Sequence, residues 1–256
     1  MPARKVWIEA ALNGPWGQAR QPLIPSTVDD IVAEGIACAK AGAAIIHVHA
    51  YDARGAAQTF DWQAYARIIE GIRARVDVPV YPSIPSAALA PGGVETSPVA
   101  RFAHTEELAR RGLLELSVVD PGSVNFSSFA EMPAGRAGHV YLNPEADIRH
   151  GLALAARYGF HPGYAIYEPG FTRLGAALWR TTVACPRPLY RFMFSDGFAW
   201  GFPPRAFGLE AHARLLEHEA PGAPWMAAGL DVDILPLIPE VVRRGGHVRV
   251  GLEDAP

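Results

Sequence analysis

The sequence predicts an α/β fold, a (β/α)8 barrel, from three observations. Short β-rich apolar runs alternate with helical stretches along the chain. This alternation is typical of a parallel sheet, because parallel strands need crossover connections. The length of 256 residues matches the roughly 250 residues of a typical single barrel. Eight candidate strands can be counted, so we expect one barrel domain over residues 1–256.

The barrel strands are predicted from short apolar segments rich in β-branched and aromatic residues. In chain order they are Val6 to Leu12, Ala44 to His49, Val78 to Pro82, Leu114 to Val119, Tyr164 to Tyr167, Tyr190 to Phe194, Trp225 to Gly229 and His247 to Leu252. A ninth run, His139 to Leu142, is interpreted as an excursion after the fourth strand. Pro133 and two glycines precede this run, and a crossover helix hardly fits there.

Helices are predicted between the strands from apolar spacing and from the residues at their ends. Val28 to Ala41 carries small apolar residues at helical spacing and ends at Gly42. Asn143-Pro144 opens another helix, because proline fits the first helical turn. Phe207 to Glu219 is a third. These helices would supply crossovers of the barrel.

The end of the chain predicts an unusual last unit. The sequence stops at Pro256, four residues past the eighth strand, so the barrel would lack the helix that follows this strand. Val248, Val250 and Leu252, on the outward face, would then be poorly shielded. Since exposed apolar surface is commonly buried between subunits, we expect a homo-oligomer.

Composition argues against several classes of partner. The net charge is −3, and no run of Lys or Arg could follow a nucleic-acid backbone. No apolar run approaches the roughly 18 residues of a membrane span, and no signal peptide is recognised. Cys38 and Cys185 form neither a CxxC motif nor a disulfide framework. We expect a cytoplasmic protein that binds neither nucleic acid nor membrane.

Two histidines end the second predicted strand. Side chains alternate along a strand, so His47 and His49 share a face, and barrel active sites lie at the carboxyl ends of the strands. Two neutral imidazoles in this arrangement can chelate one metal ion. Alternatively, one His belongs to the core and the other to the surface. The surrounding Ala and Ile residues favour the metal, because a buried ring needs a partner.

The last strand supplies a candidate third ligand. Arg249 and Glu253 share a face, and Glu253 lies where the two histidines would converge. Two His and one carboxylate leave coordination positions open, as in a catalytic site. Asp254 adds a second carboxylate beside the ion. The alternative is that Glu253 and Asp254 are solvated loop acids and that Arg249 pairs with one of them.

Taken together, these motifs resemble the β-keto acid cleavage enzyme family. The resemblance rests on AALNG at 10–14, IIHVHAYDARG at 45–55, DPGSVNF at 120–126, WMAAGL at 225–230 and GGHVRVGLED at 245–254. It spans nearly the whole chain in the right order. It implies a Zn²⁺-dependent barrel, with another divalent ion as an alternative. Such an enzyme converts a β-keto acid and the co-substrate acetyl-CoA into acetoacetate and a new acyl-CoA.

The resemblance also assigns roles to residues. It implies that His47, His49 and Glu253 bind the metal. It further implies that Asp254 is the catalytic base, assisted by Arg249, and that the hydroxyl of Ser83 lies next to the substrate.

Two positions depart from the family pattern and bear on the substrate. Trp16 stands where the aminohexanoate-cleaving member has a glutamate, and Val118 stands where the family has a hydroxyl. Trp16 would line an apolar acyl pocket or, alternatively, be a rim or interface aromatic.

Further polar residues are candidates for substrate binding. Asn13 orients substrate or caps its turn, while Ser123 and Asn125 bind a carboxylate or CoA or belong to an ordinary turn. Glu9 is a candidate partner for a ligand His.

Two other functions remain open from the residues. An amidohydrolase-like metallohydrolase also carries HxH on a barrel strand, but its pair normally ends the first strand, and later strands add further His ligands. The predicted fifth and sixth strands here carry no His ligand at their ends. A non-catalytic ligand-binding barrel is the second alternative.

Overall fold

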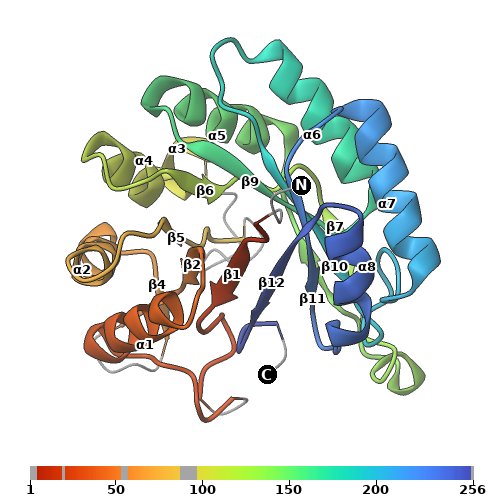
Figure 1. The fold of residues 1–256 in the computed structure, drawn as a ribbon, viewed down its shortest axis with the longest axis horizontal. Coiled ribbons are helices and arrows are strands. Elements are labelled where there is room, and N and C mark those ends of the chain that lie inside the picture. Colours follow the sequence, from red (N-terminus) through yellow and green to blue (C-terminus); the bar gives the residue numbers. More distant parts are fainter. Residues whose placement is uncertain (1–4, 19–20, 53–56, 87–96, 255–256) are drawn as a thin grey trace.

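Eight parallel strands curl into a nearly closed barrel with helices around it (Figure 1). The computed structural model describes residues 5–18, 21–52, 57–86 and 97–254. In the order in which they pair, the strands are β5 (Val80–Pro82), β2 (Ile45–Val48), β1 (Ile8–Ala11), β12 (His247–Gly251), β11 (Trp225–Gly229), β10 (Leu189–Phe194), β9 (His161–Ile166) and β6 (Leu116–Val118). The end strands β5 and β6 are in contact, although within the described ranges no backbone ladder joins them. The predicted barrel fold is confirmed.

Each predicted strand overlaps one strand of the barrel, and only the fifth differs by more than two residues at one end. That strand, β9, begins at His161 rather than Tyr164. Two short hairpins extend from the carboxyl ends of the barrel strands: β3 (Ala50–Tyr51) pairs with β4 (Gln58–Thr59), and β7 (Val124–Phe126) pairs with β8 (His139–Tyr141). The run at 139–142 is therefore an excursion, as predicted.

Helices occupy the crossovers between the strands. They are α1 (Val28–Lys40), α2 (Trp62–Arg73), α3 (Pro98–Arg101), α4 (Ala103–Arg110), α5 (Glu145–Tyr158), α6 (Pro169–Thr181), α7 (Ala206–Glu219) and α8 (Ile238–Arg243), with 3-10 turns η2 (Met132–Ala134) and η3 (Leu235–Leu237). The caps explain several ends: Thr27 accepts a hydrogen bond from the backbone N–H of Asp30, and Gly159 ends α5 with a φ of 79°. No helix among the described residues is long and apolar enough to cross a membrane.

The outer face of the last strand is better covered than the sequence predicted. Helix α8 lies against β12, and Val248 is only 4% exposed. Val250 and Leu252 are half-buried, while Ile8 on the neighbouring β1 is 43% exposed. The described residues after β12 form a turn as far as Asp254, and Pro256 lies outside them. The expectation of poor shielding was thus wrong for Val248.

The register of β12 against β1 sets the position of the site. Ala11 lies beside His47 on one side and Gly251 on the other. Gly251 has a φ of 156°, and a Cβ there would lie 2.0 Å from the carbonyl oxygen of Ala11. Only glycine fits this close approach, after which the chain turns Glu253 and Asp254 toward the barrel axis.

We predict that Gly251→Ala lowers the free energy of unfolding by more than Gly42→Ala. Gly42 also has a positive φ, 113°, but a Cβ there would meet nothing within 4 Å. Gly42→Ala should therefore lower the free energy of unfolding only by the backbone strain, about 1–3 kcal/mol. Gly251→Ala adds a collision with backbone. Denaturant unfolding measures both, and equal losses would contradict the proposed packing.

Candidate active site

A cavity of about 340 Å³ opens at the carboxyl ends of the barrel strands. Every barrel strand, or the segment that follows it, contributes to the wall. The lining residues include Trp16, His47, His49, Tyr81, Ser83, Val118, Asp120, Ala165, Tyr167, Arg191, Met193, Leu230, Arg249, Glu253 and Asp254. The position is the one in which barrel enzymes carry their active sites.

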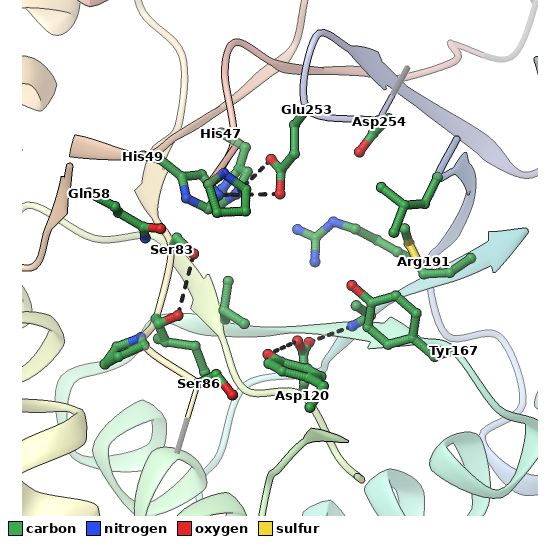
Figure 2. Close-up of a pocket in the computed structure, with 18 of the residues that line it drawn as sticks. His47, His49, Gln58, Ser83, Ser86, Asp120, Tyr167, Arg191, Glu253 and Asp254 are labelled. Carbon is green, nitrogen blue, oxygen red and sulfur yellow. Dashed lines mark hydrogen bonds and ion pairs between the residues drawn. The ribbon is translucent and has the colours of Figure 1, made fainter. Parts of the chain in front are cut away.

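His47, His49 and Glu253 converge on one side of this cavity (Figure 2). The Nε2 atoms of the two histidines are 3.3 Å apart. Each lies 3.2 Å from a carboxylate oxygen of Glu253. Three potential metal ligands from β2, its end and the turn after β12 therefore meet within 4.8 Å.

The protonation of this group suits a cation better than a network of hydrogen bonds. Burial lowers the pKa of His47 to about 4 against the opposing effect of Glu253, so the ring is neutral at pH 7 and one nitrogen has a free lone pair. Burial acts to raise the pKa of Glu253, but Arg249 and the two histidines outweigh it and hold that pKa well below its ordinary value. Two imidazoles and a carboxylate with open positions fit a divalent metal ion.

Asn13 holds His49 in place through the backbone. Its amide nitrogen donates to the carbonyl oxygens of His49 and Pro25, both at 2.9 Å, and its oxygen accepts from the backbone N–H of His49 at 2.8 Å. Asn13 is fully buried and does not line the cavity. It positions a candidate ligand, and the structure does not place it where it would touch a substrate.

Asp254 lies beside the three candidate ligands and is paired with Arg249. Nε of Arg249 is 3.0 Å from Oδ2 of Asp254, and Nη2 is 2.8 Å from Oδ1. Nη2 is also 2.9 Å from Oε2 of Glu253. Burial raises the pKa of Asp254 to about 6, against the lowering effect of Arg249. A carboxylate with such a pKa suits proton transfer near neutrality.

Below these groups lies a buried ionic network that the sequence analysis missed. Glu9 accepts from Nε of Arg191 at 2.9 and 3.0 Å, from Nη1 of Arg249 at 3.2 Å and from the hydroxyl of Tyr81 at 2.6 Å. Glu9 therefore makes its hydrogen bonds to two arginines and a tyrosine, and not to a ligand His as considered from the sequence. The available signal was Arg191, a charge within the apolar run LYRFMF.

The opposite wall is aromatic around one buried acid, Asp120 (Figure 2). One oxygen of Asp120 accepts from the backbone N–H of Ala165 and the other from the hydroxyl of Tyr141, both at 2.7 Å. Phe126 and Tyr167 line the same part of the cavity, with their ring centroids 5.1 Å apart. This wall suits an organic group packed against rings.

The remaining candidates divide between the cavity and the surface. Ser83 lines the cavity, and the ring of His104 is 2.8 Å from its carbonyl oxygen. Trp16 also lines it, and its Nε1 donates to the carbonyl oxygen of Glu253 at 2.8 Å. Ser123 and Asn125 are exposed and outside the cavity wall. Ser123 instead accepts from the backbone N–H of Asn143, which is turn chemistry.

Comparisons with known proteins agree on one family. The model of the beta-keto acid cleavage enzyme family matches residues 5–256. The chain is 27% identical to a 3-keto-5-aminohexanoate cleavage enzyme of Fusobacterium nucleatum, over 98% of the chain and 82% of that protein. It is 26% identical to a 3-oxoadipate:acetyl-CoA acetyltransferase of Cupriavidus necator, over 96% of the chain and 79% of that protein.

A solved structure also shares the fold. ObcA in a binary complex with oxaloacetate has a TM-score of 0.68 and 17% identity, over 91% of this chain. The chain spans 58% of the length of that structure.

We predict that His47→Ala, His49→Ala and Glu253→Gln each reduce the metal that the purified protein retains. A site with three protein ligands has no substitute for a lost one. Elemental analysis after dialysis measures the content, and His139→Ala is the control, because His139 lines the same cavity outside the group of three. Full metal occupancy in all three variants would remove the site.

Proposed function

The chain belongs to the beta-keto acid cleavage enzyme family, and on this premise we propose that it is a metal-dependent acyltransferase. It would join a β-keto acid to acetyl-CoA and cleave the adduct into acetoacetate and a new acyl-CoA. The observation that carries the proposal is the convergence of His47, His49 and Glu253 beside the Asp254–Arg249 pair in one cavity.

His47, His49 and Glu253 would hold the ion, for which we propose zinc. A bound divalent ion supplies Lewis acidity, which stabilises negative charge on the oxygens of a β-keto acid. Trp16 would support this arrangement from the cavity wall, because its Nε1 donates a hydrogen bond to the carbonyl oxygen of Glu253 in the turn that carries the ligand. Gly14 leaves room for the same side chain, since a Cβ there would lie 2.8 Å from Cγ of Glu253.

Asp254 would act as the base. It takes a proton from the carbon between the ketone and the carboxylate of the substrate, and that carbon then attacks the thioester carbon of acetyl-CoA and displaces the CoA thiolate. Arg249 orients Asp254 through two hydrogen-bonding nitrogens and favours its ionised form.

In the second half of the reaction the CoA thiolate is the nucleophile and Asp254 returns the proton. The CoA thiolate attacks the original ketone carbon, the bond from this carbon to the carbon that Asp254 deprotonated breaks, and the proton returns from Asp254 to give acetoacetate. Ser83 lines the cavity close to the His pair and would place its hydroxyl against the substrate. Trp16 and the aromatic wall would enclose the acyl group.

We further propose that the protein is cytoplasmic and forms a homo-oligomer. Both cysteines are free thiols, which suits a reducing cytoplasm. We propose a homo-oligomer, because Ile8 on β1 is exposed, Val250 on the neighbouring β12 is only half-buried, and contact between subunits would cover these side chains.

A product assay tests the proposed function. We expect the metal-loaded protein, given acetyl-CoA and a panel of β-keto acids, to form acetoacetate and an acyl-CoA whose mass matches the β-keto acid supplied. Mass spectrometry of the CoA esters gives the readout. Product formation without acetyl-CoA would indicate a hydrolase, and binding without any product would indicate a non-catalytic barrel.

We predict that Asp254→Asn keeps its metal and loses activity by about a hundredfold or more, which is the usual contribution of a positioned base. Steady-state acyl-CoA formation and elemental analysis are measured on the same preparation. The control is Asp196→Asn, because Asp196 is an exposed acid paired with Arg205. Near-normal turnover by the metal-loaded Asp254 variant would assign the base elsewhere.

A further inference from the structure

One buried arginine in the cavity has a nitrogen that hydrogen-bonds to no other part of the described chain. Arg191, on β10, is 2% exposed, and its Nε donates to both carboxylate oxygens of Glu9. Its Nη2 is buried and has no hydrogen-bond partner among the described residues. Buried guanidinium groups are expected to bond all their nitrogens, because a buried charged donor without an acceptor is unfavourable.

Two other buried arginines show how this fold normally satisfies the group. In Arg101, which is 1% exposed, Nε donates to the carbonyl oxygen of Pro85, Nη1 to Asp147 and Nη2 to Asn143. In Arg249 all three nitrogens likewise have carboxylate partners. Arg191 is thus the exception among these three.

The chain makes room for the guanidinium of Arg191. A Cβ at Gly163, on the neighbouring β9, would lie 2.6 Å from Nη1 and 3.0 Å from Nη2 of Arg191. On another side, the guanidinium carbon lies 5.0 Å from the ring centroid of Tyr81. Glycine, a tyrosine ring and Glu9 therefore hold the group in one position.

That position faces the cavity. Arg191 is part of the cavity wall and reaches into the space between Glu253 and Asp120 (Figure 2). Asp120 is not its acceptor, because the two oxygens of Asp120 accept from the backbone N–H of Ala165 and the hydroxyl of Tyr141. Nη2 is therefore available to an acceptor on a ligand in the cavity, and a carboxylate is the planar anion that a guanidinium recognises best.

We propose that Arg191 is a substrate-binding residue whose Nη2 donates to a carboxylate oxygen of the β-keto acid. This inference rests on the proposed function, since it names a contact in the same site. The carboxylate comes either from the acid group that every β-keto acid carries or from a second acid group at the acyl end. Both sources present the same chemistry to Arg191.

Binding in the absence of acetyl-CoA separates these sources, because no acyl transfer can then occur. The probes are acetoacetate, with one carboxylate, and 3-oxoglutarate, with two, titrated calorimetrically into the metal-loaded wild type and Arg191→Gln. We expect the variant to bind at least one probe about ten to a hundred times more weakly, as for loss of a charged hydrogen bond. Equal weakening of both assigns Arg191 to the common carboxylate; weakening of 3-oxoglutarate alone assigns it to the acyl end.

Two further variants separate binding from folding. Arg101→Gln disturbs a comparable buried ion pair outside the cavity wall, so it should lower thermal stability and leave probe affinity unchanged. Gly163→Ala keeps the guanidinium and displaces it, so it should weaken the same probe as Arg191→Gln.

Wild-type affinity in folded, metal-loaded Arg191→Gln would overturn the inference and leave Arg191 as a structural partner of Glu9. The proposed function would survive that result if the wild type forms acyl-CoA. A wild type that binds neither probe would contradict both.

Discussion

The centre of the molecule depends on the hydrogen bonds of one buried guanidinium. Arg249 contacts Glu9 inside the barrel, Asp254 in the turn after β12 and Glu253 at the mouth. Carboxylates removed from water are destabilised by several kcal/mol each unless they are paired. The three acids can therefore be buried together only because Arg249 lies between them, with Arg191 sharing Glu9. The close approach of Gly251 to Ala11 sets the path that the turn follows.

This arrangement separates the cavity into chemically different parts. His47 is neutral because burial lowers its pKa to about 4, so the negative charge beside it comes from Glu253. The floor carries two fixed cations, Arg249 and Arg191, in a region with little water to screen them. The far wall offers rings and Asp120. A ligand with an anionic oxygen end and an organic end is matched to such a cavity by charge and by shape.

The strands were well predicted because parallel barrel strands are short apolar runs between polar ends. This pattern is local, so it can be recognised in the amino-acid sequence. The sequence also placed His47, His49 and Glu253 at strand ends, and the structure brings them together.

The pairing of Glu9 with Arg191 could not be predicted from the sequence, because it joins β1 to β10 across the barrel interior and depends on the tilt of strands far apart in sequence. Asn13 and Ser123 were judged by residue type, but their hydrogen bonds go to the backbone. Val248 is buried beside α8, a helix that precedes its strand.

We propose that Asp254, beside a metal held by His47, His49 and Glu253, removes a proton from the carbon between the ketone and the carboxylate. Exchange of this proton of acetoacetate in deuterated water, followed by NMR without acetyl-CoA, isolates that step from acyl transfer. We expect exchange well above the spontaneous rate for the metal-loaded wild type, and a return to the spontaneous rate in metal-loaded Asp254→Asn. Enzyme-dependent exchange that is undiminished in that variant, or acyl-CoA formation by a wild type that does not accelerate exchange, would contradict it.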